Sequence, residues 1–415
     1  MPARLEYLSR NTRRSDGARR RQLASVLQGE SARSPRAIWH DGRMGWLRRA
    51  TRRLRFNRQP NGVAVGQLSA SEIGERDRER QAQITEARAA AFSGVDPLPL
   101  NETAPLSHEG DLVYADVDHL DRLILATSTA DPSATYGGRA LSPGWASFPR
   151  SRSAEAYSLQ ITTFSPDSSA KTTMQTVSVA YPMVQPMPDG MWLVVGARSR
   201  SLDSGPEHNA YVLGADGKPI AWFCIGDGVN DVQVTPSGHI WASYHDEGVF
   251  GNCGWGAPDG PEPLGRSGLA LWSSSGERIL ELAPPGGFDA VADCYALNVL
   301  GEDAWACYYT DFPVVHARPD GSVVGWLTDA SGPHALVVDE RGTVGLIGGC
   351  RGLFDRLIMV DISEDGIAST SATYKLAMPD SLDLPPDARV IARGRHVHAI
   401  AGDRWLRLDI GQITR

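Results

Sequence analysis

Tight glycine turns recur through the second half of the chain at near-regular intervals, and each separates two short apolar runs. Two apolar runs around such a turn are typical of a β-hairpin, because glycine readily adopts the positive φ angles that short turns require. The turns form two interleaved series. The first series is Asp189-Gly190, Ser237-Gly238, Gly301-Glu302-Asp303, Arg341-Gly342 and Arg393-Gly394, and the second is Asp216-Gly217, Ser275-Gly276, Asp320-Gly321 and Asp365-Gly366.

Two consecutive hairpins make a four-stranded meander, and a repeat of about 40 to 60 residues is the size of a propeller blade. Six such units begin near Leu112, Tyr181, Val229, Val291, His334 and Asp387. The last unit is one strand short, so a segment within residues 96–110 either links or supplies the closing strand. Closure of this kind removes exposed sheet edges. The sequence therefore predicts an all-β fold, a β-propeller of six four-stranded blades over residues 111–411.

Residues 1–95 are chemically different from the rest of the chain. They hold 20 Arg against nine acidic residues, whereas the other 320 residues hold 21 Lys and Arg against 40 acidic residues. The first 60 residues have too few regularly spaced apolar side chains to offset the entropy of ordering, so we expect disorder there, followed by a helix at residues 71–91. This Arg-rich extension either contacts nucleic acid or an acidic partner, or is a dispensable segment that precedes the true start codon.

Three stretches in the central part of the chain carry a family resemblance: Gly226 to Gln233, Asp246 to Gly251, and Asp293 to Val299. Across residues 180–350 the chain resembles an uncharacterised family of bacterial six-bladed β-propeller proteins. This resemblance implies the propeller fold and brings no known activity with it.

Composition and motifs exclude several classes of function. No apolar run of about 18 residues is present, so we expect no membrane span. The five cysteines lack C-x-x-C spacing and no apolar secretory segment follows the N-terminal charges, which favours reduced thiols and a cytoplasmic monomer. No G-x-S-x-G elbow, Walker A loop, dinucleotide-binding glycine motif or H-E-x-x-H motif occurs.

Loop length indicates which face of the propeller binds a ligand. The turns within hairpins are short, whereas the connection between the second and third strands of a blade varies from a few residues to more than 20. Loops of variable length on a regular scaffold are the usual place for recognition. The longest of them combines aromatic and charged side chains with four glycines over residues 244–256. Ligand-binding candidates on this face are Tyr244, His245, Asp246, Glu247, Phe250, Trp255, Tyr308, Tyr309, Asp311, Arg198 and Arg351.

Acidic residues at the starts of the innermost strands suggest a second kind of site. Asp231, Asp293 and Asn298 are candidate ligands for a divalent cation such as calcium, because hard cations prefer carboxylate and amide oxygens. The alternative is structural, since Asp and Asn at strand starts accept backbone N–H groups and fix turns. His396 and His398 also lie on one face of a predicted strand, a spacing found both in metal sites and by coincidence.

Two hypotheses for function follow. The leading one is a non-enzymatic scaffold that needs no cofactor and binds a protein or small ligand on the long-loop face. The rival is a metal-dependent hydrolase of the lactonase or esterase kind with a cation at the channel mouth, by analogy with other propellers. Nucleic acid is expected as a partner only through the Arg-rich extension.

Overall fold

Antiparallel hairpins account for most of the regular structure in a computed structural model that describes residues 70–137, 139–141, 147–166, 168–350 and 352–413. Strands form six four-stranded meanders, each numbered here from its innermost strand outward. The first three meanders are β3 (Asp111–Val117), β4 (Leu123–Ser128), β7 (Arg152–Ser165) and β8 (Ser168–Val179); β9 (Pro182–Pro186), β10 (Trp192–Gly196), β13 (Ala210–Leu213) and β14 (Pro219–Phe223); and β15 (Val229–Val234), β16 (Ile240–Tyr244), β17 (Leu269–Trp272) and β18 (Arg278–Glu281).

The other three meanders follow the same order from the inside outward. They are β19 (Asp293–Leu300), β20 (Asp303–Tyr309), β21 (Val314–Ala317) and β22 (Val323–Thr328); β23 (Pro333–Val338), β24 (Val344–Gly348), β25 (Arg356–Ile362) and β26 (Ile367–Ala377); and β27 (Arg389–Arg393), β28 (His396–Ala401), β29 (Arg404–Asp409) and β2 (Asn101–Pro105). The innermost strands contact one another in the order β3, β9, β15, β19, β23, β27 and again β3, which is the arrangement of a β-propeller.

The remaining elements are short, apart from one helix. They are α4 (Ala70–Ala91), β1 (Pro97–Pro99), β5 (Arg139–Leu141), β6 (Ser147–Pro149), η2 (Pro188–Gly190), β11 (Ser201–Leu202), β12 (Gly205–Pro206), α5 (Asp246–Phe250) and η3 (Ile410–Gln412). Helix α4 covers the residues where the sequence predicts a helix, while the expectation of disorder before it lies outside the described residues. No described helix is both long and apolar enough to span a membrane.

The core lies between the sheets. Six apolar clusters are present among the described residues, and each draws its side chains from two successive meanders. The sixth cluster joins the last meander to the first, with Trp405 of β29 packed beside Leu123 and Leu125 of β4. Alternation along a strand sends successive side chains to opposite sheet faces, so each meander contributes to two clusters. The tight hairpin turns also pack against side chains of the neighbouring meander. At Gly276, with φ 86°, a Cβ atom would lie 2.2 Å from Phe223 of the preceding meander.

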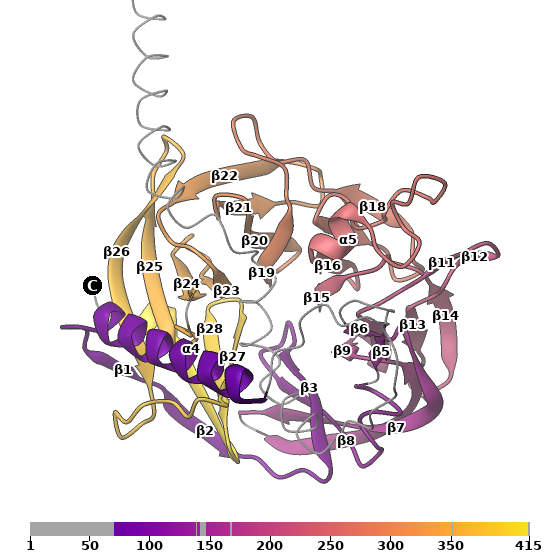
Figure 1. Ribbon diagram of the computed structural model, residues 1–415, viewed down its shortest axis with the longest axis horizontal. Coiled ribbons are helices and arrows are strands. Elements are labelled where there is room, and N and C mark those ends of the chain that lie inside the picture. Colours follow the sequence, from indigo (N-terminus) through magenta and orange to yellow (C-terminus); the bar gives the residue numbers. More distant parts are fainter. Residues whose placement is uncertain (1–69, 138, 142–146, 167, 351, 414–415) are drawn as a thin grey trace, which may run out of the picture. The chain divides into compact units, whose positions relative to one another are not determined.

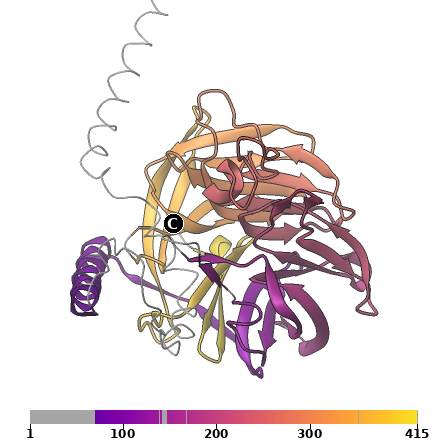
Figure 2. The ribbon, with the colours of Figure 1, turned by 45° about the vertical axis from the view of Figure 1, so that its right-hand side comes forward.

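Strand β2 gives the last meander its fourth strand. It pairs antiparallel with β29, with Asn101 opposite Arg407 and Pro105 opposite Arg404. In Figures 1 and 2 the indigo segment that follows α4 runs beside the yellow strands of the last meander. A strand from before the first meander therefore lies at the outside of the last one, and residues 96–110 hold β1 as well as β2. The fourth and fifth meanders are also joined, through a parallel pair in which Leu327 of β22 lies opposite Ile367 of β26.

Candidate functional site

The long loop between β16 and β17, residues 245–268, begins with the short helix α5 and lies against the segment that leads into β15. Glycine makes this contact possible. A Cβ atom on Gly248 would lie 2.4 Å from the carbonyl oxygen of Asp227, a distance that real Cβ atoms do not adopt. The helix is therefore fixed against its neighbour by backbone packing, and it presents Asp246 and Glu247 in its first turn. We call residues 245–268 the α5 loop.

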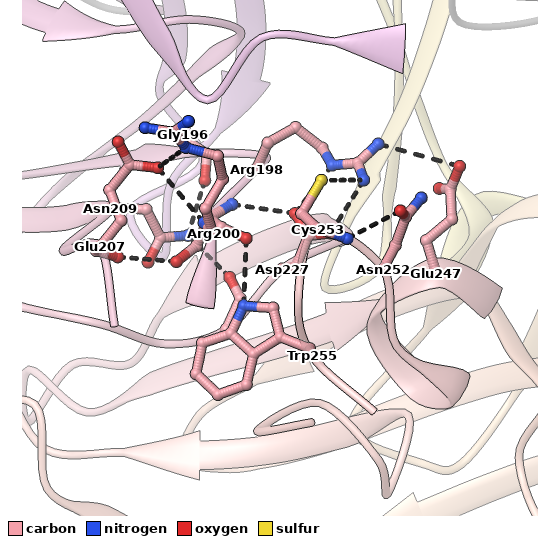
Figure 3. Close-up of polar contacts among 12 residues, drawn as sticks. Gly196, Arg198, Arg200, Glu207, Asn209, Asp227, Glu247, Asn252, Cys253 and Trp255 are labelled. Carbon is pink, nitrogen blue, oxygen red and sulfur yellow. Dashed lines mark hydrogen bonds and ion pairs between the residues drawn. The ribbon is translucent and has the colours of Figure 1, made fainter. Parts of the chain in front are cut away.

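A buried ion pair braces the α5 loop from below. Arg198 is 4% exposed, and its Nε and Nη2 donate to the two carboxylate oxygens of Asp227 at 2.8 Å each (Figure 3). The same guanidinium reaches Glu247 of α5 at 3.8 Å and the Cys253 Sγ at 3.5 Å. Burial opposes the charge of Arg198, but the hydrogen bonds and attraction of Asp227 outweigh it and raise the pKa of Arg198. Arg198, a ligand-binding candidate in the sequence, therefore lies inside the protein and supports the α5 loop.

Three of the aromatic candidates support the loop face from inside. Trp255 is buried, and its Nε1 donates to the Ser199 carbonyl oxygen at 3.1 Å (Figure 3). The buried Tyr244 hydroxyl donates to the carbonyl oxygen of Ile225 at 2.6 Å. Tyr308 is also buried, with its hydroxyl donating to the carbonyl oxygen of Asp289 at 3.1 Å. Their surfaces are covered by the protein itself, so these three side chains hold neighbouring residues in place.

Other candidates reach the surface of the loop face. Phe250, at the end of α5, is 67% exposed, the highest value for a large apolar side chain among the described residues. Tyr309 is 39% exposed and its ring lies 5.8 Å from that of Phe312. Asp246 is half-buried and Asp311 is fully at the surface. The last candidate, Arg351, lies outside the described residues.

The structure brings together two residues that the sequence assigned to different sites. His245, which precedes α5, has its Nδ1 3.7 Å from Oδ1 of Asp293 at the start of β19. Burial raises the pKa of Asp293, and the nearby imidazole of His245 opposes that rise. Oδ1 of Asp293 is buried without a hydrogen-bond partner among the described residues. The pair places a proton-exchanging group beside the acidic first turn of α5.

The three predicted metal ligands bind separate partners. Asn298 is fully buried and joins two backbone segments. Its Nδ2 donates to the carbonyl oxygens of Leu336 and Gly394 at 2.7 and 2.8 Å. Oδ1 of Asp231 accepts the backbone N–H of Val232 at 3.0 Å. Asp293 pairs with His245. These contacts are of the structural kind that the sequence left open as the alternative, and the cation remains a prediction.

A polar cluster on the innermost strands was not predicted. Asp116 of β3 accepts hydrogen bonds from Tyr114 and Gln185, while Arg393 of β27 donates to Gln233 of β15 at 2.8 Å. Burial, followed by repulsion from Asp231, raises the pKa of Asp116 to about 7. The sequence signal for this cluster was weak, because Asp116 interrupts an otherwise apolar strand pattern only once.

Only one group of three potential metal ligands comes together among the described residues. Asp121, in the turn between β3 and β4, lies beside His396 and His398 of β28. The sequence singled out the two histidines and missed Asp121, which is distant in the chain. Two cavities of about 310 and 320 Å³ also occur, and both are lined by Arg341 and Thr343 rather than by the α5 loop.

No protein-family model and no curated protein matches the sequence. Solved structures with a similar fold include a streptogramin B lyase, with a TM-score of 0.40 and 9% identity over 75% of this chain and 95% of that one. They also include the calcium-binding protein regucalcin from Agrobacterium tumefaciens, with a TM-score of 0.37 and 10% identity over 75% and 95%. A putative gluconolactonase has a TM-score of 0.36 and 12% identity over 77% and 94%. Likenesses at this level carry no argument about function.

Proposed function

We propose that this β-propeller is a binding scaffold without catalytic activity, and that its α5 loop engages a protein or small ligand with a positive charge beside an apolar group. The observation that carries the proposal is Phe250, which stands 67% exposed at the end of a helix that is otherwise tightly fixed. A partner that covers this side chain would remove its apolar surface from water, and aromatic anchors dominate the energetics of most interfaces.

Preorganisation supports the same conclusion. A glycine-rich loop loses much conformational entropy when it is ordered by a ligand, and that loss weakens binding. In this protein the ordering has already occurred in the free chain, through the Arg198–Asp227 pair and the Trp255 hydrogen bond. A rigid α5 loop therefore retains more of its contact energy on binding than a mobile loop would.

The acidic residues on this face favour a ligand with a positive charge. The first turn of α5 bears Asp246 and Glu247, both half-buried, and the exposed Asp311 lies on the next connection of the same kind. From residue 96 onward the chain holds 40 acidic residues against 21 basic ones. A negative surface attracts cationic partners and raises their association rate at low ionic strength.

Several finer features belong to this proposal. We infer one blade per meander and therefore six blades, and a bacterial protein of the kind that the sequence resembles. We also infer a cytoplasmic monomer that needs no cofactor. The five free cysteines favour a reducing compartment.

The experiment is a binding survey with a matched pair of variants. Arrayed peptides of two compositions, Lys- and Arg-rich with interspersed aromatics or Glu-rich with the same aromatics, are screened against the full chain. We expect selective binding of the basic set, and Phe250→Ser should weaken it by about tenfold or more, as for a hot-spot aromatic. Leu382→Ser, at a side chain of 65% exposure far along the chain, is the control and should leave affinity unchanged.

Equal loss of affinity in both variants, or selective binding of the acidic peptides, would contradict the proposal. The rival hydrolase is less favoured because Asp231, Asp293 and Asn298 bind separate partners. Metal analysis of the purified protein decides between the two: a full equivalent of calcium, lost on Asp231→Asn, would favour the hydrolase.

A further inference from the structure

The junction between the last and first meanders contains a cluster with the ligand types of a metal site, but its hydrogen bonds disfavour a metal ion. Oδ1 of Asp121 lies 3.0 Å from Nδ1 of His396 and 3.0 Å from Nε2 of His398. Two imidazoles and a carboxylate are the ligand types of many metal centres. His398 is fully buried, and neither Oδ1 of Asp121 nor Nε2 of His398 has an aligned hydrogen bond.

The neighbour of His398 decides its protonation. Nε1 of Trp405 donates a hydrogen bond to Nδ1 of His398 at 3.1 Å, and the indole N–H can only donate. Nδ1 must therefore carry a lone pair. A neutral imidazole has one such nitrogen, so the proton sits on Nε2 and faces Asp121. A histidine that binds a metal through one nitrogen donates from the other, which is the reverse of this arrangement.

The surroundings of His396 also disfavour a cation. Nη2 of Arg407 lies 2.8 Å from Nε2 of His396 and 3.3 Å from its Nδ1, and the same guanidinium pairs with Oδ2 of Asp121. Because arginine only donates, Nε2 of His396, the nearer nitrogen, is an acceptor. The proton of this imidazole therefore sits on Nδ1, which faces Asp121. The carboxylate thus faces three donors, and a permanent positive charge already occupies the site.

We propose that this cluster is a proton-sensitive lock between the last and first meanders: it holds while His398 is neutral and loosens when His398 takes up a proton. Protonation places a hydrogen on Nδ1, where it meets the N–H of Trp405. The acceptor is lost and two donors oppose one another in a buried setting, which is costly.

Other charges near His398 act in both directions. Asp121, from the turn between β3 and β4, attracts a proton to it, whereas His396 on the same strand and Arg407 on β29 oppose protonation. Asp409 of β29 lies 3.9 Å from Nε2 of His396 and is itself bound by Arg395. Burial is the largest influence and lowers the pKa of His398 below its usual value. The unfolded chain therefore binds the proton more tightly, and the stability of the lock falls as the pH drops below about 6.5.

The position of the lock gives it a structural consequence. Arg407 lies on β29, directly opposite Asn101 of β2, the strand that completes the last meander. Trp405 belongs to the apolar cluster that joins the last and first meanders. A proton on His398 therefore weakens the one junction at which strands from the two ends of the described chain meet.

The test is hydrogen exchange by mass spectrometry on the full chain at about pH 7.5 and about pH 5.5, corrected for intrinsic exchange. We expect peptides from β28, β29 and the β3–β4 turn to lose up to about tenfold more protection than β15 and β16, because a pH of about 5.5 lies one unit below the usual pKa of histidine. His398→Gln keeps a donor toward Asp121 but does not titrate, so it should abolish this loss. His316→Gln is the matched control and should leave it unchanged, because His316 is a buried histidine stacked on Trp305 of the fourth meander, with a pKa likewise lowered by burial.

A second variant keeps the proposal testable if His398→Gln fails to fold. Asp121 has φ 61°, a conformation that asparagine tolerates, so Asp121→Asn removes the charge with little backbone strain. It should loosen the junction already at about pH 7.5. Unchanged acid sensitivity in His398→Gln, or full protection in Asp121→Asn, would overturn the lock. So would zinc binding at about one equivalent that His398→Gln abolishes, since a tight structural zinc would then fill the site.

Discussion

Buried charges in this protein are stabilised in different ways, and the neighbours of each residue decide the result. Arg198 keeps its charge because both oxygens of Asp227 face its guanidinium. No cation among the described residues pairs directly with Asp116, which is bonded by uncharged donors. Burial and repulsion from Asp231 outweigh the attraction of Arg393, so its carboxyl holds a proton at unusually high pH. The same depth of burial thus fixes a charge at one residue and destabilises a charge at another.

Removing the guanidinium should show how much the brace contributes. Arg198→Met leaves Asp227 buried without its partner, and we expect a loss of about 3–5 kcal/mol in the free energy of unfolding. Urea unfolding of the variant and wild type measures it. Arg404→Met is the matched control, because its partner Glu102 is exposed and such a pair contributes about 0–1 kcal/mol. Equal losses in the free energy of unfolding for both variants would mean that the buried Arg198–Asp227 pair stabilises the protein no more than an exposed pair does.

Asp116 predicts a pH dependence of stability. Its pKa is about 7 in the folded protein and near 3.8 when unfolded, so the folded state binds more protons between these values. Its contribution to stability is therefore complete at low pH and is lost as the pH rises toward 7. Asp116→Asn should remove this decline, whatever its absolute stability. Urea midpoints measured across the pH series test the difference in slope, and identical slopes would refute the assignment.

At the scale of elements, the α5 loop has some properties that follow from its local sequence and others that depend on contacts with distant parts of the chain. Its glycines and its length are visible in the sequence, and so is its position between two strands. Its rigidity is not, because the groups that fix it come from the second meander and from the segment before β15. Exposed Phe250 and buried Trp255 both sit in one aromatic and glycine-rich stretch, and only the fold separates their roles.

The close contact at Gly248 leads to a prediction for this element. Gly248→Ala places a methyl group 2.4 Å from the Asp227 carbonyl oxygen, so we expect about 1–3 kcal/mol of destabilisation from overpacking, although alanine favours helices. Chemical denaturation measures the loss. Gly286→Ala adds the same methyl group where no atom lies within 4 Å, and it should change stability little. A neutral Gly248→Ala would mean that α5 is free to move.

At the scale of the whole molecule, the sequence predicted the arrangement better than the site. All-β structure and the propeller arrangement are confirmed, because hairpin turns and alternating strands are local signals that repeat. Contacts such as His245 with Asp293, or Asp121 with His398, depend on which sheets become neighbours. No spacing within a single strand carries that information, which is why the paired histidines were visible and their carboxylate partner was not.

Closure by β2 gives a prediction at this scale. A chain beginning at Leu106 lacks β2, the short strand β1 that pairs with β26, and the buried Leu100, so β29 becomes an open edge next to a depleted core. We expect a lower melting temperature and self-association, which calorimetry and light scattering measure. A chain beginning at Asp96 keeps β2 and is the control, since both truncations remove α4. Equal melting temperatures would show that β2 contributes nothing to closure.

The parallel pairing of β22 with β26 has a mechanical consequence. Other neighbouring meanders are joined by side-chain packing and by scattered hydrogen bonds, such as the one from the Val338 N–H to the Gly394 carbonyl oxygen, whereas the fourth and fifth also share a parallel strand pair, Leu327 with Ile367 and Thr328 with Ala368. Strands joined in this way must break hydrogen bonds before they slide apart. When the molecule is pulled by its ends, we expect seams without paired strands to separate before the seam between the fourth and fifth meanders, which force spectroscopy would measure.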